Sequence, residues 1–531
     1  MIWRIAKKEF SLNLLSRKFA IALVLCLLLI PVTIIVSLDN YNSLVRTYQI
    51  DKERADKELK AARVYSAVKP ILVFPPQPLS IFCQGVSNQM GHSVKIRLGE
   101  KTLLGEGSVN GRDNPLLMSF FSIDFIHVLA ILISLLGLIF SFDLFSGEKE
   151  NGTFKLLLSN PVKRSTVIIG KIVGVFLSLA PILILCYILS ILILFFSPKV
   201  HFSIADWLGI LTIFVASFFF MAFFVALGLL VSLKSRSSFN GIVVSLFLWL
   251  WFLFVWPNIS VYASQSLVRT EMLDQLQQAL RNCEKDMLTK KEEITKNLHF
   301  YNVCWNCNDG EDEYREVAGS LRRTMEEQRR FKEQYEPIRL AYADKKWQLQ
   351  RAYLDNLNKQ ERTARYISFF SPSEIFSHLG SMLCGTSAIS QQILYERARN
   401  YRETLVNYFV QNKIFASYKY FTPQAESTFL NTWDEQINIA SCGECKNGKE
   451  FEEWKRKHGG SIDIIYRCPY NDGILENYPP LNISALPIFN QYSLSITSSF
   501  PLILMETTVI LTLFLILLAM VYKASILYDV R

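Results

Sequence analysis

Six apolar runs divide this 531-residue sequence, and they constrain its fold more than any other feature. A helix needs about 20 apolar residues to cross the hydrocarbon core of a bilayer, and these runs have about that length. Half of all residues are hydrophobic, which is typical of a membrane protein with substantial polar parts. The sequence predicts a mainly α-helical membrane protein with six transmembrane helices over residues 19–37, 118–142, 167–196, 208–233, 241–257 and 500–522.

The basic residues predict how these helices are oriented. They cluster at the amino terminus, in the loop of residues 143–166, at Lys234 and Arg236, and in the tail of residues 523–531. Basic loops remain on the cytoplasmic side, and all four clusters fall there if both termini are cytoplasmic. The net charge of +9 is therefore explained by basic residues in the cytoplasmic loops. No zinc-finger, RNA-binding or helix-turn-helix pattern is present. We expect a lipid membrane as surroundings and no nucleic-acid partner.

Residues 1–18 alternate basic and apolar side chains ahead of the first apolar run. This pattern predicts an amphipathic helix that lies in the membrane interface. A basic start before an apolar run also describes a signal peptide. No small-residue cleavage site follows the run, so we expect an uncleaved first transmembrane helix.

Two polar stretches, residues 38–117 and 258–499, lie on the extracytoplasmic side in this topology. In the first, residues 94–103 alternate and predict a small hairpin. In the second, an apolar stripe begins at Leu273 with three- and four-residue spacing, and a second charged helix follows over residues 313–366. We expect an antiparallel helical hairpin, then a helix over residues 387–412. Residues 415–497 have weak strand signals, so the large extracytoplasmic domain is predicted as a helical hairpin plus a mixed α/β part.

Eight of the ten cysteines fall on the extracytoplasmic side. An even number in an oxidising compartment favours disulfides. Two C-x-x-C pairs leave open a four-thiolate zinc site, and a redox role is a third alternative, although the βαβ context of a thioredoxin-like protein is not seen. The eight are Cys83, Cys283, Cys304, Cys307, Cys384, Cys442, Cys445 and Cys468.

Three ionisable residues lie inside the apolar runs: Asp124, His127 and Glu506. Asp124 and His127 are three residues apart and therefore share one face of a helix. Charged groups inside a membrane are costly and often functional. These lie near the outer ends of their helices, where water reaches, so we favour a structural or interfacial role over a substrate contact. The sequence has no Ser/His/Asp constellation and no carboxylate pair, so we expect no catalytic site.

The loop of residues 143–166 separates the second and third apolar runs. It begins with acidic residues, continues through Gly152-Thr153 and a leucine cluster, and ends with a proline and a basic pair. Gly152 and Pro161 punctuate the segment, which leaves room for only a turn or two of helix. Periodicity alone favours an ordinary cytoplasmic loop.

In the order of its residue types, however, this loop resembles that of ABC-2 type permeases, where the same residue types recur between the second and third membrane helices. In that family the loop is a coupling helix that docks onto a separate ATP-binding subunit. The stretches ILVFPPQPLSIFCQG and SPSEIFSHLGSMLCGTS also resemble a bacterial branch of the family with large extracytoplasmic insertions. The matched coupling residues are Glu148, Gly152, Thr153, Leu157, Pro161 and Arg164, with Lys171 in the helix that follows.

The resemblance implies a permease subunit in the bacterial cytoplasmic membrane. No G-x-x-x-x-G-K-[ST] phosphate loop is present. We therefore expect this chain to hold no cofactor and not to be an enzyme, with ATP and Mg²⁺ bound by two copies of a partner ATPase. Six helices per subunit imply a second permease chain, identical or related. Two roles stay open: movement of a hydrophobic, lipid-linked or peptide substrate, or transmission of motion to an extracytoplasmic partner without transport.

Overall fold

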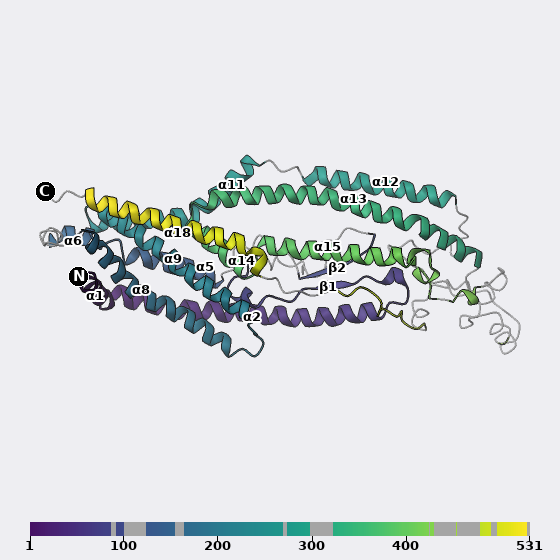
Figure 1. Cartoon of the computed structure of the whole chain (residues 1–531), viewed down its shortest axis with the longest axis horizontal. Helices are drawn as coiled ribbons and strands as arrows, with labels where there is room; N and C mark the ends of the chain where they lie inside the picture. Colours follow the sequence, from purple (N-terminus) through teal and green to yellow (C-terminus); the bar gives the residue numbers. More distant parts are fainter. Residues whose placement is uncertain are drawn as a thin grey trace, which may run out of the picture.

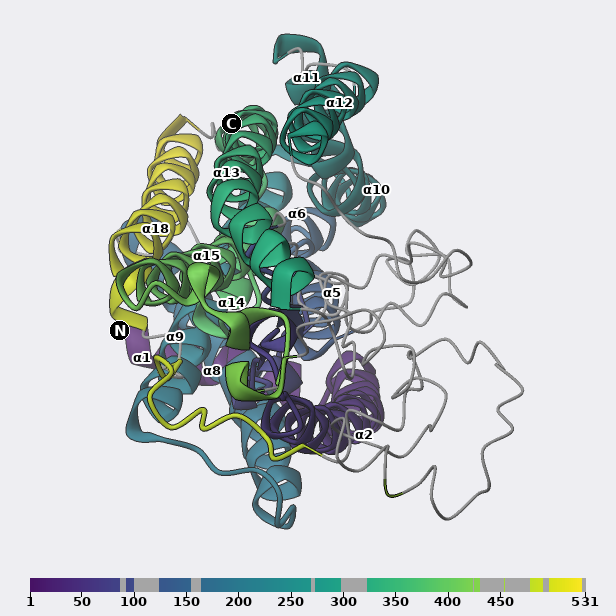
Figure 2. The ribbon, with the colours of Figure 1, turned by 90° about the vertical axis from the view of Figure 1, so that its right-hand side faces the viewer.

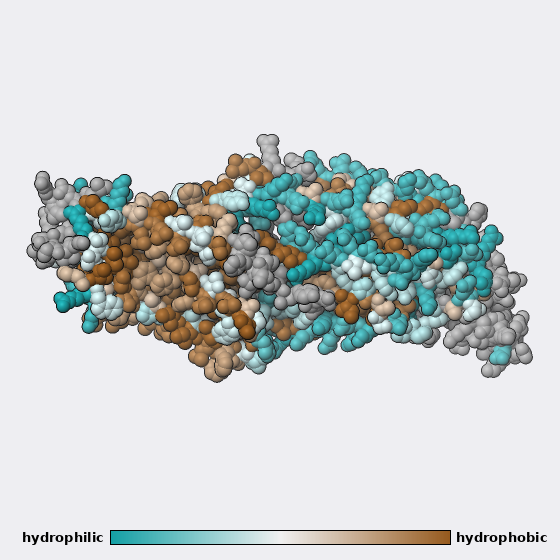
Figure 3. Space-filling model, viewed as in Figure 1, coloured by the Kyte–Doolittle hydropathy of each residue, from teal (hydrophilic) through white to brown (hydrophobic). Residues whose placement is uncertain are grey.

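The computed structural model describes residues 1–85, 92–99, 124–153, 164–268, 273–297, 322–423, 425–429, 453, 478–489 and 496–527. The molecule is elongated, with a bundle of helices in one half and long, separate helices in the other (Figure 1). Hydrophobic side chains gather over the first half and hydrophilic ones over the second (Figure 3). We call these the apolar half and the polar half. Both chain ends lie at the far end of the apolar half, which we call the terminal face.

The apolar half has five helices that are long and apolar enough to cross a membrane, counting described residues only. The fifteen-residue helix α5 (Phe125–Ile139) is also apolar. The predicted class, a mainly α-helical membrane protein with an additional domain, is confirmed. The five are α2 (Arg17–Lys60), α8 (Arg164–Phe195), α9 (Ile204–Lys234), the continuous helix Ser238–Leu267 and α18 (Ile496–Leu527). The continuous helix consists of α10 (Ser238–Leu250), a π-helical turn (Trp251–Val255) and α11 (Trp256–Leu267).

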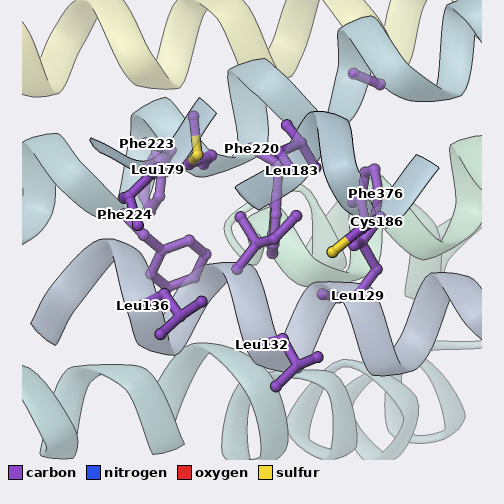
Figure 4. Packing of buried hydrophobic residues seen from close by; sticks show 14 of the residues in the cluster. Leu129, Leu132, Leu136, Leu179, Leu183, Cys186, Phe220, Phe223, Phe224 and Phe376 are labelled. Atoms are coloured by element: carbon purple, nitrogen blue, oxygen red, sulfur yellow. The ribbon is translucent and has the colours of Figure 1, made fainter. Parts of the chain in front are cut away.

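Helix α9 is the most buried of these five. Its phenylalanines meet leucines of α5 and α8 in one core (Figure 4). Phe220 stacks on Phe376 with the ring centroids 4.8 Å apart. A void beside Cys186 measures only about 10 Å³, which holds one water molecule at most.

Phe376 belongs to α14 (Pro372–Leu383), which lies in the stretch that the sequence places outside the membrane. The helix nevertheless packs into the core of the apolar half, where it contacts α5, α9 and α18. Gly380 permits this approach, because a Cβ there would lie 2.2 Å from Ile126 Cδ1. Helix α14 therefore joins the two halves.

In the polar half, α2 continues beyond the bundle on one side, and α12 (Leu273–Lys296) and α13 (Arg322–Ser368) lie on the other side, with α15 (Ala388–Gln411) between them (Figure 1). Helices α12 and α13 contact each other, as the predicted hairpin requires. Strand β2 (Ser93–Lys95) pairs antiparallel with β1 (Ile71–Val73). The second half of the predicted hairpin, residues 100–103, lies outside the described residues. Most of the predicted mixed part, residues 415–497, lies outside the described residues.

One arginine ties the polar half together. Arg402 of α15 is 1% exposed, and its Nη1 donates to Asp344 Oδ1 of α13 at 2.9 Å. Its Nε donates to the backbone oxygen of Leu98, after β2, at 3.0 Å. Burial lowers the pKa of this guanidinium, and the neighbouring carboxylate opposes that effect.

Three of the eight cysteines for which disulfides are expected lie in the described residues. Cys83, Cys283 and Cys384 are free thiols, all buried. Burial raises the pKa of Cys83 and of Cys384, which keeps both as unreactive thiols. Among the described residues, no group of three or more metal-ligating side chains is placed to hold a metal. The remaining predicted cysteines lie outside the described residues: Cys304, Cys307, Cys442, Cys445 and Cys468.

Candidate functional site

The predicted coupling segment lies on the terminal face. After α5 the chain turns into α6 (Ser146–Glu150), a helix of only five residues. Gly152 has φ +68°, a left-handed conformation that glycine adopts without steric cost. Thr153 Oγ1 donates to the backbone oxygen of Glu148 at 3.3 Å and closes the turn. Leu157 and Pro161 lie outside the described residues.

Lys171 of α8 lies at the centre of this site and is 1% exposed. Its Nζ donates to Glu148 Oε1 at 2.9 Å, to Glu9 Oε1 at 3.0 Å and to the backbone oxygen of Leu144 at 2.8 Å. The ammonium also lies 5.0 Å from the centroid of the Phe145 ring. All three N–H donors of the ammonium are therefore used, two by the coupling segment and one by α1.

Glu9 is the member of this site that sequence reasoning misses. It is the one carboxylate of α1 (Ile2–Leu14), and it is 8% exposed. The helix docks on α8, where a Cβ at Gly174 would lie 2.5 Å from the Cβ of Glu9. Gly170 and Gly174 form the small-xxx-small spacing that lets two helices approach closely. That spacing, with a lone acidic residue among basic ones, is the signal for the contact.

Helix α6 is anchored on the last turn of α9. Ser232 Oγ accepts the backbone N–H groups of Phe145 and Ser146 at 2.9 and 3.0 Å. These bonds satisfy donors that the start of a helix leaves open. Lys149 Nζ donates to the backbone oxygen of Leu233 at 2.5 Å, where the end of α9 exposes its carbonyl groups.

Two further contacts extend the site to α10 and α18. The Ser238 hydroxyl, at the first residue of α10, donates to Glu150 Oε2 at 2.7 Å. Arg164 Nη1 donates to the backbone oxygens of Ser525 and Ile526, both at 2.8 Å. The described part of the coupling segment thus contacts α8, α9, α10 and α18 directly, and it is connected to α1 through Lys171.

The predicted pair Asp124 and His127 lies at the other end of the bundle. Asp124 is 1% exposed and is the N-cap of α5. Its Oδ1 accepts the backbone N–H of His127 at 3.0 Å and lies 2.6 Å from the Nδ1 of that side chain. Its Oδ2 accepts the backbone N–H of Gln84 at 3.2 Å. The carboxylate thus satisfies one orphan donor at the start of α5, as N-caps do, and one donor of the preceding segment.

Glu506 of α18 is fully buried. Within the part of the chain that the structure describes, neither of its carboxylate oxygens has a hydrogen-bond donor. The Arg365 guanidinium of α13 is close enough to interact with it electrostatically.

Comparison with known proteins agrees with this arrangement. A family model described as ABC-2 family transporter protein matches residues 3–410. This chain belongs to the ABC-2 transporter family. The match covers every described residue of the coupling segment and the helices α8, α9 and α10 that it contacts. No curated protein matches the chain.

Membership makes this ABC-2 protein a multi-pass membrane permease subunit of an ABC transporter. The family resemblance inferred from the coupling motif is confirmed. An ABC-2 permease has no ATPase site of its own and implies an ABC ATPase as partner.

Proposed function

We propose that this ABC-2 permease receives work from its ATPase at the coupling segment and uses it to export or translocate a hydrophobic or lipid-linked substrate. The observation that carries the proposal is Lys171, buried between Glu148 of the coupling segment and Glu9 of α1. In this proposal the terminal face is cytoplasmic, in agreement with its basic residues.

The geometry supports a rigid connection. Separating buried opposite charges is costly in a low-dielectric site, so a displacement of Glu148 carries Lys171 with it. Lys171 lies near one end of α8, whose 32 residues extend about 48 Å at 1.5 Å per residue. A small push at the coupling segment would therefore tilt α8 and the docked α1 as one body.

The complete assembly that we propose has two ATPase subunits, which bind ATP and Mg²⁺, and two permease chains, identical or related. It lies in the bacterial cytoplasmic membrane with both permease termini inside. The permease contributes no residue to ATP chemistry, because its sequence has no phosphate loop.

Replacing Gly152 tests the coupling site. A β-branched residue at φ +68° is strained by about 1–3 kcal/mol, and no atom of the described residues lies within 4 Å of its Cβ, so the change distorts the turn without a clash in the described core. We expect Gly152→Val to reduce the ATPase that co-purifies with the permease at least tenfold, measured by mass spectrometry and ATP hydrolysis. Gly147→Ala, whose Cβ meets only ordinary contacts from 3.6 Å, is the matched control. Full retention of the ATPase by Gly152→Val would falsify the assignment.

The alternative function is transmission of motion to an extracytoplasmic partner without transport. One observation favours it: the continuous helix Ser238–Leu267 contacts the coupling segment at one end and the polar half at the other. There, Trp256 Nε1 donates to the backbone oxygen of Ile367 in α13 at 3.0 Å. Helix α13 has 47 residues and extends about 70 Å. ATP hydrolysis without movement of a fluorescent lipid across reconstituted vesicles would support this second function over the first.

A further inference from the structure

A pocket of about 460 Å³ lies between α13, α15 and α18, close to the boundary between the apolar and polar halves. In the view along the long axis, α13, α15 and α18 occupy neighbouring positions (Figure 2). Its volume falls in the range of sites that hold small molecules. Its wall is mixed, with charged residues on α13 and α15 and apolar residues on α15 and α18. Its lining includes Glu361, Arg362, Arg365, Ile393, Glu396 and Met505.

The wall contains a buried cation with an unused donor. Arg365 is 7% exposed, and its Nε has no hydrogen-bond partner among the described residues. Its Nη2 lies 3.6 Å from Glu361 Oε1, longer than a hydrogen bond. Glu506, which interacts electrostatically with Arg365, is buried without a donor in the same described set. Glu506 does not line the pocket, so a ligand there meets the Arg365 guanidinium itself, and a charged hydrogen bond to it would add to the incomplete pairing with Glu361.

The charges of the wall select a class of ligand. Arg362 and Arg365 are balanced by Glu361 and Glu396, so the lining is neutral overall. A zwitterion matches such a lining better than an anion does. Guanidinium groups bind phosphate with paired hydrogen bonds, and the carboxylates are suited to an ammonium group.

The level of the pocket along the membrane normal indicates where that ligand comes from. Met505 lies near the start of the apolar stretch Ile503–Ile526, which is long enough to span a membrane. Tyr366, in the last turn of α13, and Phe370, two residues beyond it, are 62% and 69% exposed. Exposed aromatic residues beside an apolar stretch are typical of the headgroup region of a bilayer.

We propose that this pocket binds the headgroup of a zwitterionic aminophospholipid from the leaflet that adjoins the polar half. The phosphate lies against Arg362 and Arg365, and the ammonium lies against Glu361 and Glu396. The bound lipid connects α13 and α15 with α18, so it braces the polar half against the bundle. This inference does not depend on the proposed transport function.

Native mass spectrometry of the full chain in detergent tests the proposal, with phosphatidylethanolamine or phosphatidylglycerol added. We expect one phosphatidylethanolamine per chain, retained at least tenfold more tightly than phosphatidylglycerol. Arg362→Gln removes an exposed phosphate donor and is expected to weaken that retention about tenfold. Ile393→Trp, which fills the pocket without a charge change, is expected to have the same effect. Arg351→Gln, an exposed arginine of α13 outside the pocket, is the matched control and retains the lipid.

Thermal unfolding of each variant checks that its fold is kept. Wild-type retention by both Arg362→Gln and Ile393→Trp would overturn the site. Equal affinity for the two lipids would overturn the zwitterionic assignment. Displacement of the lipid by a similar concentration of glycerophosphoethanolamine, which has no acyl chains, would overturn the lipid as source and indicate a soluble phosphodiester.

Discussion

At the scale of the residue, the charges around Lys171 are unequal. Two carboxylates, Glu9 and Glu148, share one ammonium, so the site carries one excess negative charge when both are ionised. Loss of one carboxylate leaves a balanced ion pair. Loss of the ammonium leaves two carboxylates close together in a buried site, which is much less favourable.

We therefore predict that Lys171→Met destabilises the protein by about 3–5 kcal/mol, the cost of breaking a buried ion pair. Glu9→Gln removes only the excess charge and is expected to cost about 1 kcal/mol, because the amide oxygen still accepts a hydrogen bond. Thermal unfolding, monitored by size-exclusion chromatography, measures the destabilisation of both variants. Lys8→Gln, an exposed change on the same helix as Glu9, serves as control. Equal destabilisation by Lys171→Met and Glu9→Gln would contradict the charge argument.

Part of this site is readable from sequence. Glu148, Gly152 and Lys171 belong to a local motif, and the positive φ of Gly152 is the kind of conformation for which a chain uses glycine. Glu9 is different, because it reaches Lys171 across 162 residues. A local pattern does not reveal such a partner, and an amphipathic pattern alone assigns a charged residue to the polar face.

At the scale of the element, the π-helical turn Trp251–Val255 interrupts the helix Ser238–Leu267. The backbone oxygen of Phe252 accepts the hydroxyls of Ser371 and Ser373 at 2.6 and 2.8 Å. Turns of this kind change the helical hydrogen-bond pattern and are frequent at functional sites. The sequence of the turn is ordinary and apolar, and its partners lie about 120 residues later, so sequence reasoning predicts a plain helix here.

Replacing both serines by alanine removes two hydrogen bonds to this carbonyl group. We expect Ser371→Ala/Ser373→Ala to lower stability by about 2 kcal/mol in total, at about 1 kcal/mol per bond. The thermal midpoint measures this effect. Ser266→Ala is the control, because that exposed hydroxyl bonds only within its own helix, to Ala263. A double variant that unfolds at the same temperature as this control would show that the serines do not hold the turn.

The strands also show that sequence patterns predict an element but not its tertiary partner. Alternation predicts a strand near Val94, and a strand is present. Its partner Leu72 comes from an earlier segment, and the choice depends on how the two segments pack between α2 and α15. The apolar face of α14 likewise predicts that this segment is a helix. Its position in the bundle, however, depends on the tertiary contact between Gly380 and Ile126.

At the scale of the whole molecule, composition and apolar runs predict a membrane bundle with a separate polar part, and the structure has both. The predicted sides of the membrane and the number of crossings remain predictions. The cohesion of the polar half, in contrast, comes from contacts that no local pattern encodes. Asp344 accepts from Arg399 and Arg402, and it thereby links α13 to α15.

We expect Asp344→Ala to loosen the polar half without affecting the bundle. Among the described residues it leaves the buried Arg402 with the Leu98 carbonyl as its one hydrogen-bond acceptor, at a cost of about 2 kcal/mol. Hydrogen–deuterium exchange is expected to rise in α13 and α15 and to stay unchanged in α5, α8 and α9. Asp355→Ala, an exposed change on α13, is the control. Increased exchange in the bundle helices to the same degree would contradict separate cohesion of the two halves.

The docking of α1 on α8 also has a consequence for biosynthesis. The ribosome makes the first helix about 180 residues before it completes the surface on which that helix rests. At 5–20 residues per second this interval lasts roughly 10–40 s. Throughout that time the apolar face of α1 needs other cover, which the membrane interface supplies to a helix of this kind. The nascent chain therefore first places α1 on lipid and moves it onto protein only when α8 is complete.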